Sequence, residues 1–363
     1  MQLAQAWVAQ LPPVPVRLVD RSPQLSADQL AERFVPPPRF RSVRFETFDP
    51  NPDHPSQAAA RTDLEALVAG LGGGGAASGR GGLFRRARPA SGSAVRGRYL
   101  DGGFGVGKTH LLASSWHAAP APKSILSFEE LTAFVGFVGM QKAISTFRGH
   151  RILCIDEFEL DDVANTRMAV TFLRAVVDSG TTVITTSNAV PDRLGEGRFN
   201  AEDFAREIAD IASHFEVLRI DGPDFRALQH PPNSDLSTAD EVARVVAAAP
   251  PGSVSVDRFD DVLAHLRKVH PVHYGALIDG LEAVVIEGVV PIENQGAALL
   301  FVQLIDEIYD AGITFAATGC PIGEIFPDSY RRGGYRKKYG RCESRLNALI
   351  AEARPGSSAT GAG

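Results

Sequence analysis

The segment YLDGGFGVGKTHLL at residues 99–112 matches the pattern G-x-x-x-x-G-K-[ST] at all four fixed positions. Glycines let a backbone turn its N–H groups around a polyphosphate, and a helix that follows points its positive end at the same anion. Lys108 is expected to reach the β- and γ-phosphates, and Thr109 to bind Mg²⁺. The predicted nucleotide-binding residues are Gly102, Gly103, Phe104, Gly105, Val106, Gly107, Lys108, Thr109 and His110.

A second motif, RILCIDEF at residues 151–158, is apolar until it reaches Asp156 and Glu157. An apolar run of this kind predicts a buried parallel strand, and ligands bind beyond the carboxyl ends of such strands. We expect Asp156 to bind Mg²⁺ and Glu157 to orient and deprotonate an attacking water. A helix-capping acid pair is the alternative. Combined with the glycine loop, the pair favours ATP hydrolysis with ATP and Mg²⁺ as cofactors.

A third candidate, Asn188, follows the expected strand TTVITTS at residues 181–187 and is expected to contact the γ-phosphate or the attacking water. Phosphoryl transfer also needs a cation near the oxygens between the β- and γ-phosphates. The alternative for Asn188 is a turn residue, and for each arginine an ordinary surface position. The arginines that qualify are Arg193, Arg198 and Arg206, acting from a neighbouring subunit, and Arg345, folding back over the nucleotide.

From Tyr99 onward, apolar runs alternate with helical stretches, which is typical of a parallel sheet wrapped by helices. We predict an α/β P-loop fold of three αβα layers around a five-stranded parallel sheet. A long insertion is expected before the last strand, and a small helical element after it. The expected strands are 98–101, 124–128, 151–156, 181–186 and 313–318. The expected helices are 109–117, 129–147, 163–178, 296–311 and 343–353.

Ahead of the glycine loop, Val43, Phe45 and Phe48 approximate period-two spacing, which predicts an edge strand leading into a helix over 56–70 capped by Ser56. Core packing is the preferred account of these aromatic residues. Residues 70–98 are rich in Gly and then Arg, and are expected to form a flexible basic insert. The insert is interpreted either as a solvated loop or as a docking site for an acidic partner or nucleic acid.

The segment from Tyr330 to Arg341 interleaves six cations with three tyrosines. Two interpretations stay open: stacking on single-stranded bases, or a basic connector that docks on an acidic protein. The second is preferred because the chain has a net charge of -6 and shows no recognisable nucleic-acid fold.

Composition places the chain among ordinary globular proteins, with 363 residues, 44% hydrophobic and 22% charged. Without a signal peptide or an apolar run of bilayer length, a cytoplasmic location is expected. The three cysteines are too far apart to indicate a disulfide framework or a zinc site. The expected parts are an N-terminal extension (1–38), a P-loop core (39–226), an insertion or helical subdomain (227–310), a last core strand with a C-terminal helix (311–353) and a disordered tail (354–363).

The order of these motifs resembles the ZapE-type (AFG1-like) cell-division AAA+ ATPases. The resemblance runs from about Arg39 to Leu349 and includes more than the two nucleotide motifs. Near residues 195–206 the chain departs from the family pattern, which leaves the choice of trans-acting arginine open. The segments that carry it are 102–109, CIDEF at 154–158, TSN at 186–188, the Asp-Phe-Arg run at 224–226, LIDEIYD at 304–310 and SRL at 344–346.

The resemblance implies an ATPase that is recruited to the division septum and destabilises the cell-division (FtsZ) ring. It also implies an ATP-dependent homo-oligomer, and the segment GEGRF at 195–199 indicates an actinobacterial branch. Two rivals remain: a helicase-loader-like ATPase stimulated by nucleic acid, and a scaffold that binds ATP without turnover. The presence of both Asp156 and Glu157 argues against the scaffold.

Overall fold

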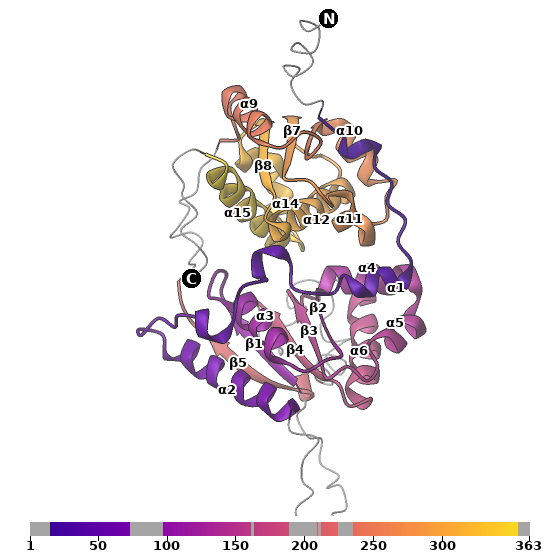
Figure 1. Cartoon of the computed structure of the whole chain (residues 1–363), viewed down its shortest axis with the longest axis vertical. Coiled ribbons are helices and arrows are strands. Elements are labelled where there is room, and N and C mark those ends of the chain that lie inside the picture. Colours follow the sequence, from indigo (N-terminus) through magenta and orange to yellow (C-terminus); the bar gives the residue numbers. More distant parts are fainter. Residues whose placement is uncertain are drawn as a thin grey trace, which may run out of the picture. The chain divides into compact units, whose positions relative to one another are not determined.

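The structure, a computed structural model, describes residues 15–72, 97–160, 163–188, 209, 212–223 and 235–354. The chain divides into two compact units (Figure 1). The P-loop unit comprises residues 27–36 and 40–225, and the second unit comprises residues 1–26, 37–39 and 226–362. In the ranges that are described, no helix combines the length and the hydropathy that a bilayer span requires.

The P-loop unit contains five parallel strands in the order β2-β3-β4-β1-β5. This confirms the predicted parallel α/β sheet of five strands. In β3 the first four residues are fully buried, as expected for an apolar strand covered on both faces. The strands are β1 (Gly97–Gly102), β2 (Lys123–Ser127), β3 (Ile152–Asp156), β4 (Thr182–Ser187) and β5 (Phe215–Ile220).

Helices cover both faces of this sheet. On one face, Leu111 and Leu112 of α3 pack with residues of α2 against the buried side chains of β2, β3 and β4. On the other, Phe134, Phe147 and Phe172 form edge-to-face ring contacts. The helices of the unit are α1 (Ala27–Glu32), α2 (Pro55–Gly72), α3 (Lys108–Ala118), α4 (Phe128–Val138), α5 (Met140–Phe147) and α6 (Val163–Asp178).

Three sequence predictions about this unit are wrong. The fifth strand is β5, hydrogen-bonded beside β1, whereas the run predicted as the last core strand, 313–318, belongs to another sheet. Residues 43–48 form a single 3-10 turn at Phe45–Thr47 instead of an edge strand, although Phe45 and Phe48 are buried as expected. The helix predicted over 129–147 is interrupted because Gly139 adopts a left-handed φ of 81°.

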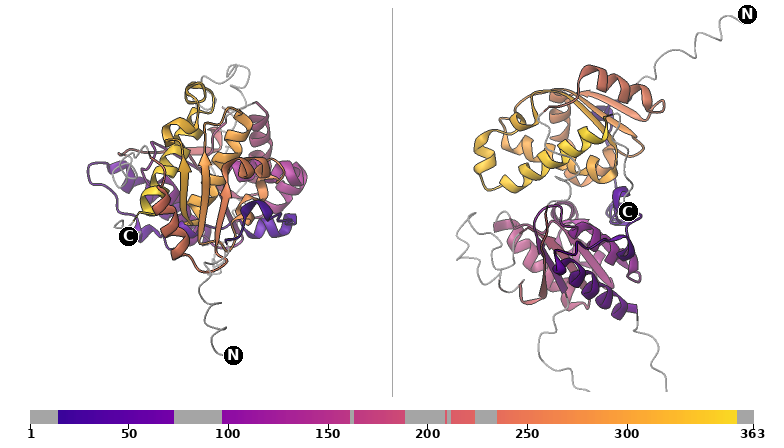
Figure 2. Two further views of the ribbon diagram at one scale, coloured as in Figure 1. Left: turned by 90° about the horizontal axis from the view of Figure 1, so that it is seen from above. Right: turned by 90° about the vertical axis from the view of Figure 1, so that its left-hand side faces the viewer.

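The second unit is a separate α/β layer structure with a parallel sheet of order β6-β7-β8 (Figure 2). Its main core lies between the sheet and the helices α10, α12 and α15. Residues on both sides of the boundary expected at 310/311 share this core, so that boundary does not divide the structure. The elements are α9 (Ala239–Ala248), β6 (Val254–Arg258), α10 (Phe259–Leu266), α11 (Tyr274–Leu277), β7 (Ala283–Val289), α12 (Gln295–Ala311), β8 (Thr314–Gly319), α13 (Ile322–Ile325), α14 (Asp328–Arg332) and α15 (Arg336–Glu352).

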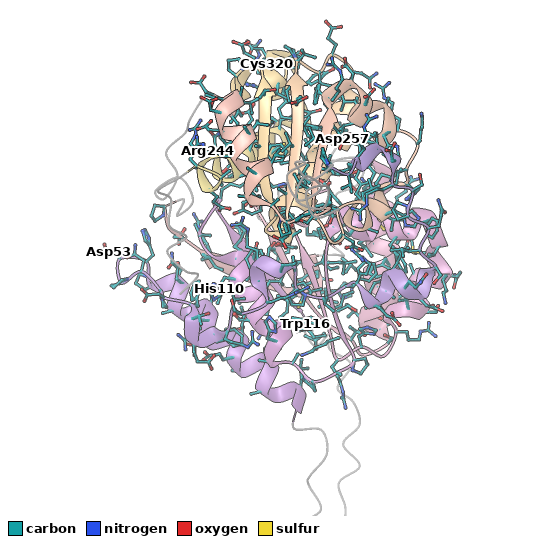
Figure 3. The ribbon with its side chains drawn as sticks, turned by 45° about the horizontal axis from the view of Figure 1, so that its top comes forward. Asp53, His110, Trp116, Arg244, Asp257 and Cys320 are labelled. Carbon is teal, nitrogen blue, oxygen red and sulfur yellow. The ribbon has the colours of Figure 1, made fainter. Side chains whose placement is uncertain are left out.

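The N-terminal segment pairs with an edge strand in each unit. Ile125 N of β2 donates to Phe34 O at 3.0 Å in the P-loop unit, and Val256 N of β6 donates to Val16 O at 3.2 Å in the second unit. Asp257, labelled in Figure 3, adds a side-chain contact, because Oδ2 accepts a hydrogen bond from Leu18 N at 2.8 Å. Both edges are thereby covered at these positions, which limits pairing with other chains.

Candidate nucleotide site

The glycine loop joins β1 to α3, and two of its glycines are required by close contacts. A Cβ at Gly102 would collide with the backbone oxygen of Ile220, and one at Gly107 would lie 2.5 Å from Cε2 of Phe48. Gly107 also adopts a left-handed φ of 92° and begins α3 without a side-chain cap. The first N–H groups of α3 therefore face the loop without a capping side chain, which is the arrangement that binds phosphate.

The ammonium group of Lys108 lies at the mouth of this loop. Nζ donates to the carbonyl oxygen of Gly102 at 2.8 Å, to that of Gly103, and to Asn188 Oδ1 at 2.9 Å. Asn188 Nδ2 in turn donates to Glu159 Oε1 at 3.3 Å. Sequence reasoning missed Glu159, which is 6% exposed. Its position two residues after Glu157 was the signal that could have identified it.

Thr109, at the start of α3, meets Asp156, at the end of β3, although β4 lies between β3 and the strand that precedes the glycine loop, β1. Thr109 Oγ1 donates to Asp156 Oδ2 at 3.0 Å, because α3 crosses over the sheet from the end of β1 toward β3. The other carboxylate oxygen, Oδ1, accepts a hydrogen bond from Thr186 Oγ1 of β4. A hydroxyl and a carboxylate are thus held together beside the phosphate loop.

Glu157 sits in a turn that begins where β3 ends. It has a φ of 54°, a conformation that L residues rarely adopt and that is often found at functional sites. Its N–H donates to Thr186 Oγ1 at 2.9 Å and to Asp156 Oδ1 at 3.1 Å, while Phe158 N donates to Thr186 O at 2.7 Å. Thr186 therefore contacts both acidic residues, a role that the sequence did not predict.

The side chains of three predicted nucleotide-binding residues, Phe104, Val106 and His110, differ in burial and in their contacts. Val106 is buried in the core, whereas Phe104 is 37% exposed. His110 (Figure 3) points its ring at Phe48, with ring centroids 5.4 Å apart, and its Nε2 lies 3.1 Å from Arg44 O. Burial lowers the pKa of His110 below its ordinary value. For Val106 and His110, any contact with phosphate would come from the backbone.

The arginines predicted to assist catalysis are placed only in part. Arg193, Arg198 and Arg206 lie outside the described residues. The Arg345 side chain is 7% exposed, pairs with Asp306 at 2.5 Å, and lies over the ring of Tyr309. The alternative of a solvated helix face is therefore wrong for Arg345, and its proposed nucleotide contact stays a prediction.

The basic, tyrosine-rich segment 330–341 is partly buried in the second unit: Tyr339 and Arg341 are buried, whereas Arg332 and Arg336 are exposed. Tyr339 is fully buried and stacks with Tyr330 at 5.5 Å between ring centroids. Arg341 is 4% exposed and pairs with Asp306 at 2.7 Å. These two residues serve the interior of the unit, so the segment is not a continuous surface for stacking bases.

A magnesium ion would fit the donors at this site. Among the described residues, no group of three or more His, Cys, Asp or Glu forms a metal site without other ligands. Mg²⁺ typically binds through one or two protein oxygens together with substrate phosphates and water. The Thr109 hydroxyl and the Asp156 carboxylate, 3.0 Å apart, are oxygen donors of this kind.

Comparison with known proteins shows which family the chain resembles. A sequence profile described as AFG1-like ATPase matches residues 44–248 and 227–354. Cell division protein ZapE of Escherichia coli K12 is 33% identical over 144 residues, covering 36% of this chain and 38% of ZapE. An uncharacterized protein of Schizosaccharomyces pombe is 22% identical over 283 residues, covering 64% of this chain and 62% of that protein. The match to ZapE thus spans less than half of its length.

Solved structures resemble parts of the chain weakly. DnaI is 19% identical with a TM-score of 0.40, covering 53% of this chain and 98% of that chain. The DnaC helicase loader is 18% identical with a TM-score of 0.36, covering 50% of this chain and 99% of that chain. The profile match, by contrast, covers more than half of the chain and confirms the family predicted from the sequence. The chain belongs to the AFG1-like ATPase family.

Proposed function

We propose that this chain carries out Mg²⁺-dependent hydrolysis of ATP at the loop between β1 and α3. The observation that carries the proposal is the 3.0 Å hydrogen bond between Thr109 Oγ1 and Asp156 Oδ2. It brings the phosphate loop and the acidic strand end, 47 positions apart in sequence, to one place. A single metal-bound triphosphate can then contact both motifs.

Each residue has a distinct task in this reaction. The N–H groups of the loop and the Lys108 ammonium bind the phosphates, and Thr109 and Asp156 hold the metal. Mg²⁺, when bound, neutralises charge on the β- and γ-phosphate oxygens. Glu157 accepts a proton from the attacking water, and Asn188 donates a hydrogen bond to that water or to the γ-phosphate. The left-handed turn at Glu157 directs its side chain differently from that of Asp156.

The test is Glu157→Gln, which keeps the shape of the side chain and removes the base. Loss of a general base costs about 10²- to 10⁴-fold in rate, so kcat should fall by that factor while ATP binding is retained. The same substitution at the exposed Glu46 is the control and should leave kcat unchanged. Equal turnover by the Glu157→Gln variant and the unmodified chain would support a scaffold without hydrolysis.

We further propose that hydrolysis remodels a protein assembly, the FtsZ ring. In this proposal the protein is cytoplasmic and is recruited to the division septum. The ZapE relative and the motif order shared with its family support this proposal. Light scattering from FtsZ polymers should fall when the chain and ATP are added, and stay constant with the Glu157→Gln variant. Capture of single-stranded DNA, with ATPase stimulation by it, would instead favour the helicase-loader-like alternative.

The trans-acting arginine can be tested by complementation. We propose an ATP-dependent homo-oligomer in which Arg198 or Arg206 of one subunit faces the nucleotide of the next. An Arg198→Ala or Arg206→Ala chain should then regain activity when mixed with a Lys108→Ala chain, because each supplies what the other lacks. Absence of recovery for both arginines, together with a monomer under all nucleotide conditions, would contradict this arrangement.

A further inference from the structure

The sheet of the second unit repeats the register of three strands of the P-loop unit. Five pairs join β2 to β3, from Lys123↔Ile152 to Ser127↔Asp156, and five pairs join β6 to β7, from Val254↔Ala283 to Arg258↔Glu287. The first residue of the middle strand then pairs with Thr182 of β4 in one unit and with Thr314 of β8 in the other. Glu287 therefore takes the place of Asp156.

The backbone hydrogen bonds around these strands match as well. Where the middle strand begins, Arg151 N donates to Pro122 O at 2.7 Å, and Glu282 N donates to Ser253 O at 2.7 Å. The helix before the third strand ends in the same way, because Gly180 N donates to Val177 O and Gly312 N to Tyr309 O. Both edge strands also pair with the N-terminal segment at matched residues, where the N–H groups of Ile125 and Val256 donate hydrogen bonds to it.

The helix before the first of the three strands is matched too. In the P-loop unit this helix is α3, which packs against Cys154 and Ile184. In the second unit it is α9, whose Val242 and Val245 pack against Val285 and Ala316, the residues at the corresponding register positions. The second unit is thus a second copy of the α3-β2-β3-β4 part of the P-loop unit.

A residue with a left-handed φ follows the matched acidic position in both units: directly after β3 in the P-loop unit, and inside β7, where its register with β8 shifts, in the second unit. Glu157 has a φ of 54° and Gly288 a φ of 73°. The N–H of each donates to the hydroxyl of a threonine on the neighbouring strand, to Thr186 at 2.9 Å and to Thr318 at 3.2 Å. The threonine therefore holds the left-handed turn whether or not an acidic residue occupies it.

Most of the groups proposed for chemistry are replaced in the copy, although Glu287 keeps a carboxylate at the position of Asp156. Counted along the chain from the paired starts of the strands, Gly288 corresponds to Glu157, and Cys320, labelled in Figure 3, corresponds to Asn188. In place of the glycine loop, α9 begins with a capping box: Thr238 Oγ1 accepts from Glu241 N, and Glu241 Oε2 accepts from Thr238 N. The Glu241 carboxylate and the Thr238 hydroxyl each occupy one N–H group at the start of this helix, and the carboxylate repels an anion there.

We infer that the second unit is a copy of the nucleotide-binding core that has kept the turn and lost the chemistry, and that Thr186 positions Asp156 and Glu157 for the reaction proposed above. In the P-loop unit alone, the threonine hydroxyl makes a second bond, donating to Asp156 Oδ1. One hydroxyl therefore fixes the carboxylate that holds the metal and the backbone of the residue that activates water. The inference rests on the proposed hydrolysis.

The test compares the same change in the two copies of the full chain. Thr186→Val and Thr318→Val each remove a threonine hydroxyl at the same register position while keeping the shape of the side chain. Partners that orient metal ligands typically contribute 10- to 100-fold to activity. We expect Thr186→Val to lower kcat by about this factor and to raise the Mg²⁺ concentration needed for half-maximal rate. Thr318→Val should leave both quantities within about twofold, because its copy holds no nucleotide.

Three further measurements separate positioning from folding. Thr186→Ser keeps the hydroxyl and should recover most of kcat; if Thr186→Val does not fold, Thr186→Ala replaces it in the comparison. Thr186→Val should still bind a non-hydrolysable ATP analogue in the absence of Mg²⁺. A general loss of structure would abolish this binding. The unmodified chain should bind one nucleotide, and Lys108→Ala none.

The inference is overturned if Thr186→Val keeps the original kcat and Mg²⁺ dependence. It is also overturned if Thr318→Val lowers kcat as much as Thr186→Val does, or if kcat of Thr186→Ser is no higher than that of Thr186→Val. Binding of a second nucleotide, still measurable in Lys108→Ala, would show that the second unit binds nucleotide and would overturn this part of the inference. If the unmodified chain shows no hydrolysis, the proposed function fails by itself. The Mg²⁺ dependence of nucleotide binding in the two valine variants then still decides the role of Thr186.

Discussion

Lys108 and Asn188 are joined by a direct hydrogen bond of 2.9 Å between Nζ and Oδ1, although they are 80 positions apart in sequence. The bond links the phosphate loop to the end of β4. A second hydrogen bond, from Asn188 Nδ2, links this pair to the buried Glu159. The amide of Asn188 is therefore held beside the Lys108 ammonium, the group proposed to bind phosphate. This geometry supports a role for Asn188 in the chemical step more than in affinity.

We accordingly expect Asn188→Ala to lower kcat by roughly 10²-fold, the usual effect of removing one positioned hydrogen-bond donor. The KM for ATP should change by much less, because the loop N–H groups and Lys108 still bind the phosphates. Steady-state kinetics would separate the two effects. Asn347→Ala, in α15 of the second unit, is the control; a rise in KM with unchanged kcat for Asn188→Ala would contradict this assignment.

Gly107→Ala tests the packing beneath the phosphate loop. The new Cβ would lie 2.5 Å from Phe48 Cε2, at a residue with a φ of 92°. The left-handed conformation alone costs about 1–3 kcal/mol for a residue other than glycine. We expect a lower thermal midpoint and loss of nucleotide binding, with part of the midpoint restored by adding Phe48→Leu.

The matched control for Gly107→Ala is Gly136→Ala in α4, where an added Cβ meets nothing within 4 Å. Alanine is favoured over glycine inside a helix by about 0.5–1 kcal/mol, so this variant should be as stable as the original chain or more so. Equal midpoints for the Gly107→Ala variant and the original chain would show that the loop tolerates a side chain.

Asp306→Asn tests the ion pairs inside the second unit. Asp306 pairs with Arg341 at 2.7 Å and with Arg345 at 2.5 Å, and both arginine side chains are at least nine-tenths buried. Breaking a buried pair leaves uncompensated charge and costs about 3–5 kcal/mol. Denaturant unfolding should show this loss. Asp328→Asn, whose partner Arg332 is 4.0 Å away on the surface, should change stability by less than about 1 kcal/mol.

Stability should fall as the pH is lowered from about 7 to 5.5. Burial lowers the pKa of His110, His117 and His150, as it does for His270 and His273. In the unfolded chain these side chains take up protons near pH 6.5, whereas in the folded state they take them up only at lower pH. The unfolded state therefore binds more protons below that pH and is favoured there. Thermal midpoints measured across this range would show the decline.

The contribution of one histidine to this pH dependence can be isolated with His150→Gln. His150 Nε2 lies 3.2 Å from Ser124 Oγ, a contact that the glutamine amide can replace without titrating. The midpoint of this variant should decline less steeply with falling pH. An unchanged slope would assign the decline to other groups.

Much of the nucleotide site was predictable because its parts are local in sequence. The glycine loop, the acid pair at the end of an apolar run and Asn188 after the next run each depend on residues within one loop or strand end. Parallel strands bring their carboxyl ends to one edge, so the meeting of these parts followed from the strand pattern. Of the missed residues, Glu159 offered only its position two residues after Glu157, and Thr186 offered no signal, since a threonine in a strand is ordinary.

By itself the sequence determined the family, the alternation of strands and helices, and the residues offered to phosphate and metal, because these depend on side-chain type and short spacing. Only the tertiary structure decided which strands share a sheet: β5 and β8 are both apolar runs, and long-range backbone hydrogen bonds alone distinguish their partners. The same holds for Arg345 and Tyr339, whose residue types suggest the surface. Their burial depends on the groups that the fold packs around them, Asp306 in the first case and Phe326 in the second.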